Sequence, residues 1–344
     1  MKNLKRKGEN MSYLYVCEHG AVIGIEGNRF QVKYKNDLVK SIPAETLEMI
    51  EVFGKVQLIT RCIEECLKRG VNVIFYSTNG AYFGRLISTN HVNVQRQRKQ
   101  AALEENDVFK IEFSKRIIEA KIKNQIVILR RYARERNIDI HRSVDLMQSM
   151  HRKVLEAENI EQIMGYEGTA AKIYFSELGK LIVPEFAFTG RSRRPPLDPF
   201  NSMISLGYSI ILNEFYGKLE GKGLNPYFGF MHRDREKHPT LASDLMEEWR
   251  AVLIDSTVLS MLNGHELVLD DFYTPEGERG VFLSKEAFRK YIRKLDTKFR
   301  TQNRYLSYVG ESTSFRKAMD LQVAQLVKAV ENGDATIYEP VVIR

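Results

Sequence analysis

The spacing of apolar positions changes part-way along the chain. From residue 12 to about residue 88, short apolar runs alternate with turn residues, as is typical of β structure. Strands are predicted at residues 13–16, 21–25, 30–34, 38–42 and 49–53. Residues 71–76 and 81–86 flank Asn79-Gly80, a strong hairpin signal. One helix is expected over residues 57–68, ending before Gly70.

After about residue 90 the apolar period becomes helical, and it stays so to about residue 331 with breaks at glycines and prolines. We therefore expect an α+β protein. A small N-terminal β-rich domain, sandwich-like with one helix, precedes a larger all-α C-terminal domain. The expected parts are a mobile basic extension at 1–10, the β domain at 11–90, a polar and basic linker at 91–100, the α domain at 101–331 and a tail at 332–344. Residues 336–343 are expected to form one extended segment.

The composition excludes several classes of protein but does not identify the function. The 344 residues are 43% hydrophobic and 28% charged, which excludes a disordered or collagen-like chain. No apolar run approaches the ~18 residues of a membrane-spanning helix, so no membrane partner is expected. The 52 basic and 44 acidic residues give a net charge of +8, which suits a polyanionic partner but does not identify one. Residues 1–100 hold 16 of the basic and 9 of the acidic residues, so the remaining 36 and 35 leave the helical part almost neutral.

The cysteines indicate a reducing compartment. Cys17, Cys62 and Cys66 leave an odd thiol and contain no C-x-x-C pair. Cys62 and Cys66 are one helical turn apart, a spacing that suits neither a disulfide nor a zinc site. We expect a cytoplasmic protein.

Chemistry in the helical part depends on scattered acids and histidines, because the common catalytic motifs are missing. Glu167 is the first candidate. On a helix it shares a face with Ala170, Ala171 and Tyr174, and a carboxylate there would be largely desolvated. The alternative is a solvated Glu in the first turn of a helix, favoured by the helix dipole.

Two further segments carry candidate groups. His232 ends an apolar, glycine-punctuated run that begins at Gly223, and it is either a functional group or a packed core histidine. Downstream, Asp244, Glu247 and Glu248 lie within five residues and repel one another unless a cation lies among them. On a helix packed on one side only, Glu247 would be solvated. A functional role for Glu247 therefore requires a helix that lines a cleft or is buried on two sides.

Basic residues recur in the helical part, and several tyrosines accompany them. Each basic run is by itself typical of a solvated helix face, whereas together they would suit contacts with a phosphate backbone. Tyrosines near the acids offer stacking or hydrogen-bonding surfaces. The candidate DNA contacts are Tyr166, Arg193, Arg194, Asn201, Tyr216, Arg233 and Arg235.

The order of these motifs resembles a known family. The motifs are, in order, Gly-Tyr-Glu-Gly-x-Ala-Ala from Gly165, Pro-Pro-x-Asp-Pro-x-Asn from Pro195, Gly-Leu-x-Pro-Tyr-x-Gly-Phe-Met-His from Gly223 and Asp-Leu-Met-Glu from Asp244. No single motif is specific, but the ordered set over residues 11–330 is similar to the CRISPR-associated adaptation integrase, the first-numbered and near-universal Cas protein.

The resemblance implies a divalent-metal site in the helical domain. The family's ligands, a Glu, a His and a second acid, correspond here to Glu167, His232 and Glu247, and these are also the implied catalytic residues. Asp244 and Arg250 correspond to a supporting acid and a basic residue near the metal. Two carboxylates and an imidazole suit Mg²⁺ or Mn²⁺.

The resemblance also implies a reaction and partners. The expected reaction is attack by the 3′-OH of a captured double-stranded DNA fragment on a phosphodiester at the edge of a CRISPR repeat, with hydrolysis when water replaces the hydroxyl. The expected partners are the CRISPR repeat and leader DNA, a second copy of the chain bound through the β domain, and a small ferredoxin-like CRISPR-associated companion subunit. The alternatives are a non-catalytic nucleic-acid scaffold of the same kind of complex and a hydrolase of small phosphoesters.

Overall fold

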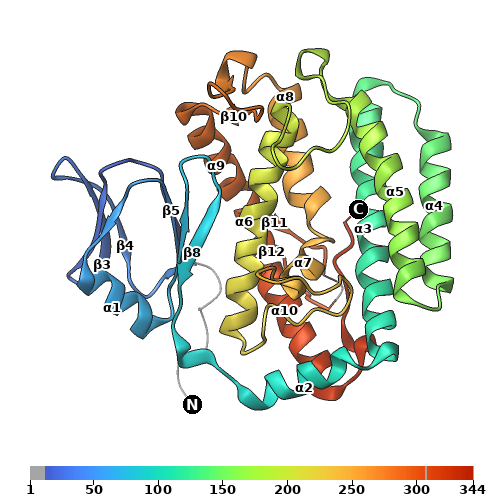
Figure 1. Cartoon of the computed structure of the whole chain (residues 1–344), viewed down its shortest axis with the longest axis horizontal. Helices are drawn as coiled ribbons and strands as arrows, with labels where there is room; N and C mark the ends of the chain where they lie inside the picture. The colour runs from blue at the N-terminus through green and yellow to red at the C-terminus, as the bar shows by residue number, and fades with distance from the viewer. Residues whose placement is uncertain (1–11, 307, 344) are drawn as a thin grey trace. The chain divides into compact units, whose positions relative to one another are not determined.

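The computed structural model describes residues 12–306 and 308–343, and the chain divides into two compact units between Val92 and Asn93. The predicted mobile extension at residues 1–10 lies outside the described residues. Strands make up most of the first unit, whereas the second is larger and mainly helical (Figure 1). The predicted α+β fold class is thereby confirmed.

Two four-stranded sheets form the first unit. One has the order β1-β5-β7-β8, made of β1 (Ser12–Val16), β5 (Leu47–Phe53), β7 (Asn72–Tyr76) and β8 (Tyr82–Leu86). The other has the order β4-β3-β2-β6, made of β4 (Asp37–Pro43), β3 (Arg29–Tyr34), β2 (Val22–Glu26) and β6 (Gln57–Leu58). Neighbours in the chain pair antiparallel in β2–β3, β3–β4 and β7–β8, while β1, β5 and β7 run parallel. Every predicted strand is present.

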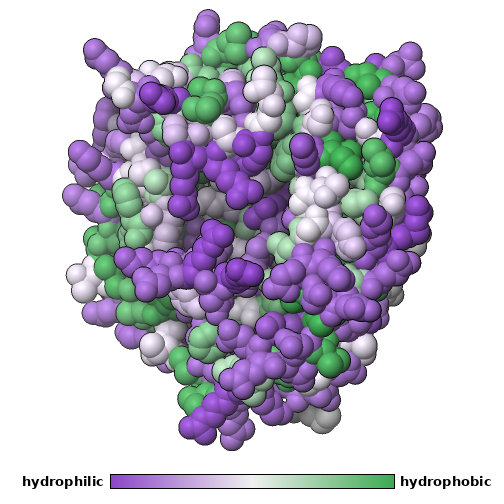
Figure 2. Space-filling model, turned by 45° about the vertical axis from the view of Figure 1, so that its right-hand side comes forward, coloured by the Kyte–Doolittle hydropathy of each residue, from purple (hydrophilic) through white to green (hydrophobic). Residues whose placement is uncertain are grey.

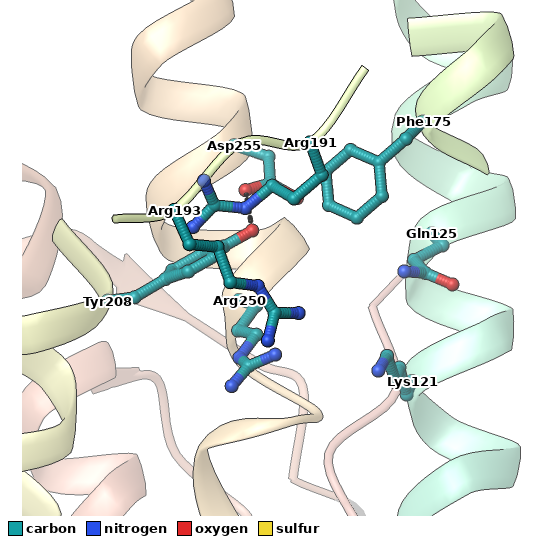
Figure 3. A pocket seen from close by; sticks show the side chains of 8 residues that line it. All are labelled: Lys121, Gln125, Phe175, Arg191, Arg193, Tyr208, Arg250 and Asp255. Atoms are coloured by element: carbon teal, nitrogen blue, oxygen red, sulfur yellow. Dashed lines mark hydrogen bonds between the residues drawn. The ribbon is translucent and has the colours of Figure 1, made fainter. Parts of the chain in front are cut away.

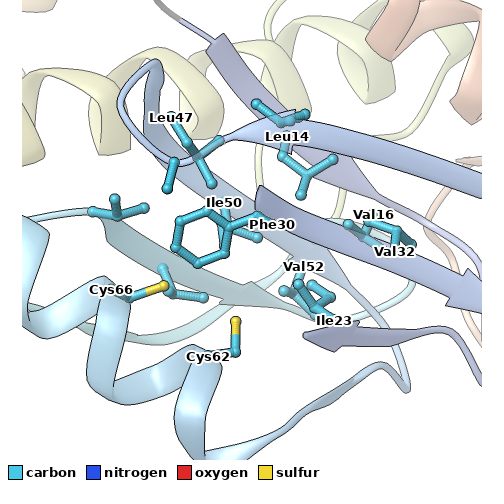
Figure 4. Close-up of a cluster of buried hydrophobic side chains, with 14 of the residues drawn as sticks. Leu14, Val16, Ile23, Phe30, Val32, Leu47, Ile50, Val52, Cys62 and Cys66 are labelled. Atoms are coloured by element: carbon cyan, nitrogen blue, oxygen red, sulfur yellow. The ribbon is translucent and has the colours of Figure 1, made fainter. Parts of the chain in front are cut away.

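The two sheets share one apolar core (Figure 4). Because successive side chains of a strand point to opposite faces, Leu14 and Val16 of β1 enter the core together and meet Phe30 of the other sheet. Helix α1 (Thr60–Arg69) adds Cys62 and Cys66, both fully buried. Both thiols are free, so they act here as small apolar side chains.

Two boundaries in this region differ from the prediction. The helix expected over 57–68 begins at Thr60, because β6 pairs in parallel with β2. The linker expected at 91–100 is mostly helical: a 3₁₀ turn (Thr89–His91) leads into α2 (Val94–Glu104). Hydrogen bonds rather than an apolar stripe hold α2. The side chain of Asn93 caps it, and the buried amide of Gln100 bonds to the backbone of Asn225 and Phe228.

The second unit is built of helices with a few short strands. The long helices are α3 (Asp107–Arg136), α4 (His141–Glu156), α5 (Ile160–Leu181), α6 (Pro199–Gly221), α9 (Lys285–Arg300) and α10 (Phe315–Asn332). The shorter helical elements are α7 (Thr240–Met246), a π-helical segment (Arg250–Asp255), α8 (Ser256–Asn263) and the 3₁₀ turns Pro184–Phe186, Leu269–Asp271 and Ala335–Ile337. The strand pairs are β9 (Phe272–Tyr273) with β10 (Phe282–Leu283) and β11 (Gln302–Asn303) with β12 (Thr313–Ser314).

The helical segment from Thr240 to Asn263 is buried over nearly its whole length and circumference. Helices α3, α4 and α5 pack side by side, and α6 packs against α7 (Figure 1). Gly207 lets α6 pack closely against the π-helical segment and α9, since a Cβ there would lie 2.5 Å from both Cγ2 of Ile254 and the hydroxyl of Tyr291. Within residues 12–306 and 308–343, no helix is long and apolar enough to cross a membrane.

Candidate active site

Glu167 lies in the interior of α5. The helix begins at Ile160 and continues through Gly165, so the interpretation of Glu167 as a first-turn residue is wrong. The predicted face is confirmed, because Ala170 and Tyr174 are fully buried on it. The Glu167 side chain is 14% exposed, and a carboxylate so far desolvated needs a positive partner.

Asp244 holds His232 in place. Oδ1 of Asp244 lies 2.7 Å from Nδ1 of His232 and accepts the backbone N–H of the same residue. Oδ2 accepts the backbone N–H groups of Phe230 and Met231 at 2.8 and 3.1 Å. Since a carboxylate oxygen accepts, Nδ1 carries the hydrogen and Nε2 is left to face Oε1 of Glu247, 3.8 Å away. This is the arrangement in which a second carboxylate fixes the orientation of a metal-binding histidine.

A glycine allows the loop before His232 to reach Asp244. A Cβ at Gly229 would lie 2.4 Å from Cγ2 of Thr240 and 3.0 Å from Oδ2 of Asp244. Contacts this short are not tolerated, so any larger residue at 229 would move the loop or α7. A glycine is therefore needed three residues before His232 for steric reasons.

Glu247 lies where α7 ends and the chain passes into the π-helical segment. Its side chain is 3% exposed, and Nη1 of Arg250 lies 2.9 Å from its Oε1. The segment is buried on all sides, which meets the condition that the sequence set for a functional Glu247. Burial alone would raise the pKa of Glu247, but Arg250 and Lys121 outweigh burial and lower the pKa to about 2.

A lysine lies between the two candidate metal-binding glutamates. Nζ of Lys121, on α3, is 2.5 Å from Oε1 of Glu167 and 2.5 Å from Oε2 of Glu247. Oε2 of Glu247 is buried, and its partner is this ammonium. In the part of the chain that the structure describes, no three His, Cys, Asp or Glu side chains converge closely enough to surround a metal ion as they stand.

The donor set nevertheless fits a divalent cation. Glu167 and Glu247 already share one positive charge, and Nε2 of His232 faces the second carboxylate. Two carboxylates and an imidazole are ligands that Mn²⁺ and Mg²⁺ sites use.

A cavity of about 140 Å³ adjoins this cluster (Figure 3). Side chains of α3 and α5 lie on one side of it, and those of the 191–193 loop, α6 and the π-helical segment on the other. Its lining residues are Lys121, Gln125, Phe175, Arg191, Arg193, Tyr208, Arg250 and Asp255. Four of these carry positive charge and one is an acid, so the cavity suits an anion.

The acid of the cavity is already engaged. Asp255 accepts hydrogen bonds from the hydroxyls of Tyr174 and Tyr208 at 2.8 and 2.5 Å. Burial raises the pKa of Asp255 to about 6, although these hydrogen bonds and the nearby arginines favour its charged form. Above it, the guanidinium groups of Arg191 and Arg250 lie over the Tyr208 ring, 5.5 and 4.9 Å from its centre. The arginines are thereby held at the cavity, while each carboxylate oxygen of Asp255 accepts from a tyrosine hydroxyl.

The candidate DNA contacts divide into exposed and buried groups. Arg193, Arg194, Arg233 and Arg235 are exposed, and Tyr166 is half-buried. Tyr216 and Asn201 are buried, so neither side chain offers DNA an exposed surface in this structure, and their predicted DNA contact stays a prediction. The amide of Asn201 instead accepts from Nη1 of Arg191 at 2.7 Å and donates to the carbonyl of Gly190. Asn201 thus holds Arg191 at the cavity.

The view in Figure 2 shows a largely hydrophilic face, on which apolar side chains are scattered. The large exposed apolar residues of the helical unit include Leu146, Leu155 and Leu197, which lie apart in the sequence. Such a face agrees with solvated basic runs rather than with an apolar docking groove.

Sequence reasoning missed Lys121 and Asp255, and it assigned no role to Arg191. Lys121 stands in the apolar run of α3, between Ala120 and Ile122, and a charged residue in such a run was the available signal. Asp255 likewise interrupts an apolar stretch. Which partner neutralises either group depends on tertiary packing, which the sequence pattern does not reveal.

Comparison with known proteins decides the family. A family model described as CRISPR associated protein Cas1 matches residues 14–297. The chain belongs to this family. The resemblance inferred from the ordered motifs is confirmed.

Curated Cas1 relatives match nearly the whole chain. The CRISPR-associated endonuclease Cas1 of Mycobacterium tuberculosis is 37% identical over 324 residues, which are 94% of this chain and 95% of that protein. A CRISPR-associated endonuclease Cas1 of Thermus thermophilus is 32% identical over 342 residues, 98% of this chain and 99% of that protein.

Solved structures share the fold. A CAS1 protein from Thermotoga maritima superposes with a TM-score of 0.79 at 22% identity, covering 94% of this chain and 98% of that one. A casposase bound to integration product has a TM-score of 0.82 at 22% identity, covering 97% of this chain and 96% of that one. At these identities the likeness concerns the fold.

Proposed function

We propose that this Cas1 family protein is a divalent-metal-dependent DNA endonuclease and integrase of CRISPR adaptation. In this proposal, the 3′-OH of a captured DNA fragment attacks a phosphodiester at the edge of a CRISPR repeat, and water can replace the hydroxyl. One observation carries the proposal. Glu167 and Glu247 converge on one cation position, with His232 beside it, next to an arginine-lined cavity.

The side chains of the cluster divide the work. Glu167, Glu247 and Nε2 of His232 hold Mg²⁺ or Mn²⁺, and Asp244 keeps the imidazole oriented. When bound, such an ion polarises a scissile phosphate and stabilises charge on the attacking and leaving oxygens. Arg250 balances the charge of Glu247 at Oε1, whereas Lys121 contacts Oε2.

In this proposal, the scissile phosphate would lie in the arginine-lined cavity. Arg191 and Arg193 offer guanidinium N–H groups, which form charge-assisted hydrogen bonds with phosphate oxygens. These contacts position a DNA backbone without reading its sequence. Specificity for a repeat or leader sequence must therefore come from other surfaces or from a partner subunit.

The partners belong to the same proposal. Curated relatives of the family are named endonucleases, one structural neighbour is a casposase bound to integration product, and another is part of a Cas1–Cas2 complex. We propose DNA and a small companion subunit as partners of this chain. A homodimer through the β unit is supported by its edge strands, where Val39 of β4 is 64% exposed and Phe83 of β8 is 72% exposed.

The first prediction tests the metal-holding role of His232. His232→Ala removes an imidazole ligand while leaving the cavity arginines, so strand transfer should fall to below ~1% of wild type. DNA binding should change by less than about threefold, because phosphate contacts supply most of that affinity. The assay follows joining of a labelled DNA fragment to a repeat-containing target with Mn²⁺, and again with a chelator.

The matched control is His238→Ala. His238 lies on the same loop, and its Nε2 is 2.8 Å from the hydroxyl of Ser243 rather than near the glutamates. Its variant should retain strand transfer. Wild-type strand transfer by a folded His232→Ala variant would refute the site, and metal-independent activity of the wild type would refute the metal requirement.

A further inference from the structure

Lys121 occupies the position that the proposed metal needs. Its side chain is 8% exposed, it enters from α3, and its ammonium touches a carboxylate oxygen from α5 and another from the end of α7. We propose that Lys121 is an internal counter-cation that holds Glu167 and Glu247 together in the metal-free protein and is displaced by the metal. This inference rests on the proposed function, since it concerns the same site.

Electrostatics supports this role in the metal-free protein. Without a cation between them, the Glu167 and Glu247 carboxylates would repel each other in a desolvated site. The Lys121 ammonium contacts one carboxylate oxygen of each glutamate, whereas the 2.9 Å ion pair of Arg250 is with Glu247.

The same charges make joint occupancy unfavourable. A divalent ion that binds both glutamates would lie within a few ångströms of the ammonium, and like charges at such distances in a poorly solvated site repel strongly. A metal bound to both glutamates and a Lys121 ammonium in its present position therefore exclude each other. The affinity for metal must include the free energy needed to move the lysine.

The cavity gives the displaced side chain somewhere to go. Lys121 already lines it together with Gln125, one turn further along α3, and the arginines lie across the cavity (Figure 3). An ammonium that moves into the cavity adds positive charge where the proposed phosphate would bind. Metal binding would then strengthen phosphate binding, and linkage requires the reverse effect to be equal.

The second prediction measures metal binding directly. Lys121→Met removes the ammonium and keeps an apolar stem of similar length. In full-length protein without DNA, at one fixed pH, the variant should bind Mn²⁺ about tenfold more tightly than wild type, measured by the electron paramagnetic resonance of free Mn²⁺. In a chelator its melting temperature should be lower than that of wild type, and added Mn²⁺ should raise it by more.

Lys123→Met is the matched control. Lys123 is on the same helix, but its ammonium pairs with Glu119 at 2.5 Å and its side chain is 42% exposed. Mn²⁺ affinity should therefore stay at the wild-type value. Lys121→Gln provides a second test variant that retains a polar head, in case the methionine variant does not fold.

Failure of this inference and failure of the proposed function are distinguishable. If wild type binds Mn²⁺, His232→Ala loses that binding and folded Lys121 variants bind Mn²⁺ no more tightly than wild type, the metal site stands and the counter-cation role is overturned. If wild type binds no Mn²⁺ and Lys121→Met also binds none, the metal site itself is refuted. Tighter binding by Lys121→Met with an unchanged Lys123→Met supports the exchange.

Discussion

At the scale of single residues, two adjacent glutamates show that surroundings determine the charge of a side chain. Burial would raise the pKa of both. Around Glu247, Arg250 and Lys121 outweigh burial and lower the pKa to about 2. Around Glu248 burial prevails and raises the pKa to about 7, because its hydrogen-bond donors, such as the Tyr338 hydroxyl, are neutral. Of these two neighbours, Glu247 is therefore the one that is held in the charged form.

A third prediction concerns Asp255. Its folded-state pKa of about 6 exceeds the ordinary value of 3.8, so between pH ~4 and ~6 the folded state holds more protons than the unfolded state. Stability from this group is accordingly lost as pH rises through that window. Between pH 4.5 and 7.5, wild type should lose roughly 2 kcal/mol more unfolding free energy than Asp255→Asn, which cannot ionise.

Urea unfolding at the two pH values measures this difference. Asp270→Asn alters an exposed acid of the same unit and should show the wild-type pH dependence. The prediction concerns the change between the two pH values, so a uniform loss of stability in Asp255→Asn does not affect it. Equal pH dependence of wild type and Asp255→Asn would contradict it.

At the scale of elements, the sequence pattern performed best where burial is one-sided. The strand around Phe30 and the hairpin at Asn79 were predictable, because apolar residues alternate along the first and Asn-Gly is a typical hairpin turn. Helix α2 was not, because Gln100 and other polar groups hold it through hydrogen bonds. The π-helical segment after Glu247 was not predictable either, because the spacing of its apolar residues does not distinguish it from an α-helix. Its geometry nevertheless determines where Arg250 and Asp255 point.

The residues of the candidate site could be predicted from the sequence, but their arrangement could not. Glu167, His232 and Glu247 were found through ordered motifs, whereas the burial of Glu247 required two-sided packing that a helical wheel does not supply. The cation between the glutamates comes from α3, far away in the sequence, so only the tertiary structure brings Lys121 to them.

A fourth prediction tests the contact between the 223–239 loop and α7. Gly229→Ala places a methyl group 2.4 Å from Cγ2 of Thr240 and 3.0 Å from Oδ2 of Asp244, which also holds His232. The variant should lose about 1–3 kcal/mol of unfolding free energy through overpacking. Its Mn²⁺ affinity should fall by about 10-fold or more, because the imidazole shifts.

Gly221→Ala is the control for this variant. Gly221 ends α6, and a Cβ there meets no atom within 4 Å, so stability and Mn²⁺ affinity should remain near wild type. Chemical denaturation and Mn²⁺ titration of the three proteins provide the comparison. A Gly229→Ala variant that matches wild type in both measurements would show that the loop can yield without moving His232.

At the scale of the whole chain, net charge was a weak indicator of function. The helical part is almost neutral by sequence, yet its cavity gathers four positively charged side chains. Packing at this scale also depends on residues far apart. The side chain of Asn124 in α3 bonds to the backbone of Val341 and Ile343, the latter 219 positions along the chain. The predicted tail therefore packs on the helical unit through the buried residues Tyr338, Val341 and Ile343, and it contacts the segment that carries Glu247.

A final prediction tests this long-range contact. The Tyr338 hydroxyl and the backbone N–H of Val341 both donate to the buried carboxylate of Glu248, next to Glu247. Tyr338→Phe keeps the ring but removes one donor from a group that burial already disfavours in its charged form. Unfolding free energy should fall by about 1–3 kcal/mol in urea titrations at pH 8.

Tyr227→Phe is the control, because Tyr227 is 41% exposed and its variant should lose less than about 0.5 kcal/mol. The loss in Tyr338→Phe should also shrink when the pH is lowered from 8 to 5, below the pKa of about 7 of Glu248, because a protonated carboxyl needs fewer donors. A loss that is the same at both pH values would mean that the hydroxyl stabilises the fold through packing rather than through Glu248. In that case the 338–343 segment would anchor the helical unit without acting on the charge of Glu248, next to the candidate site.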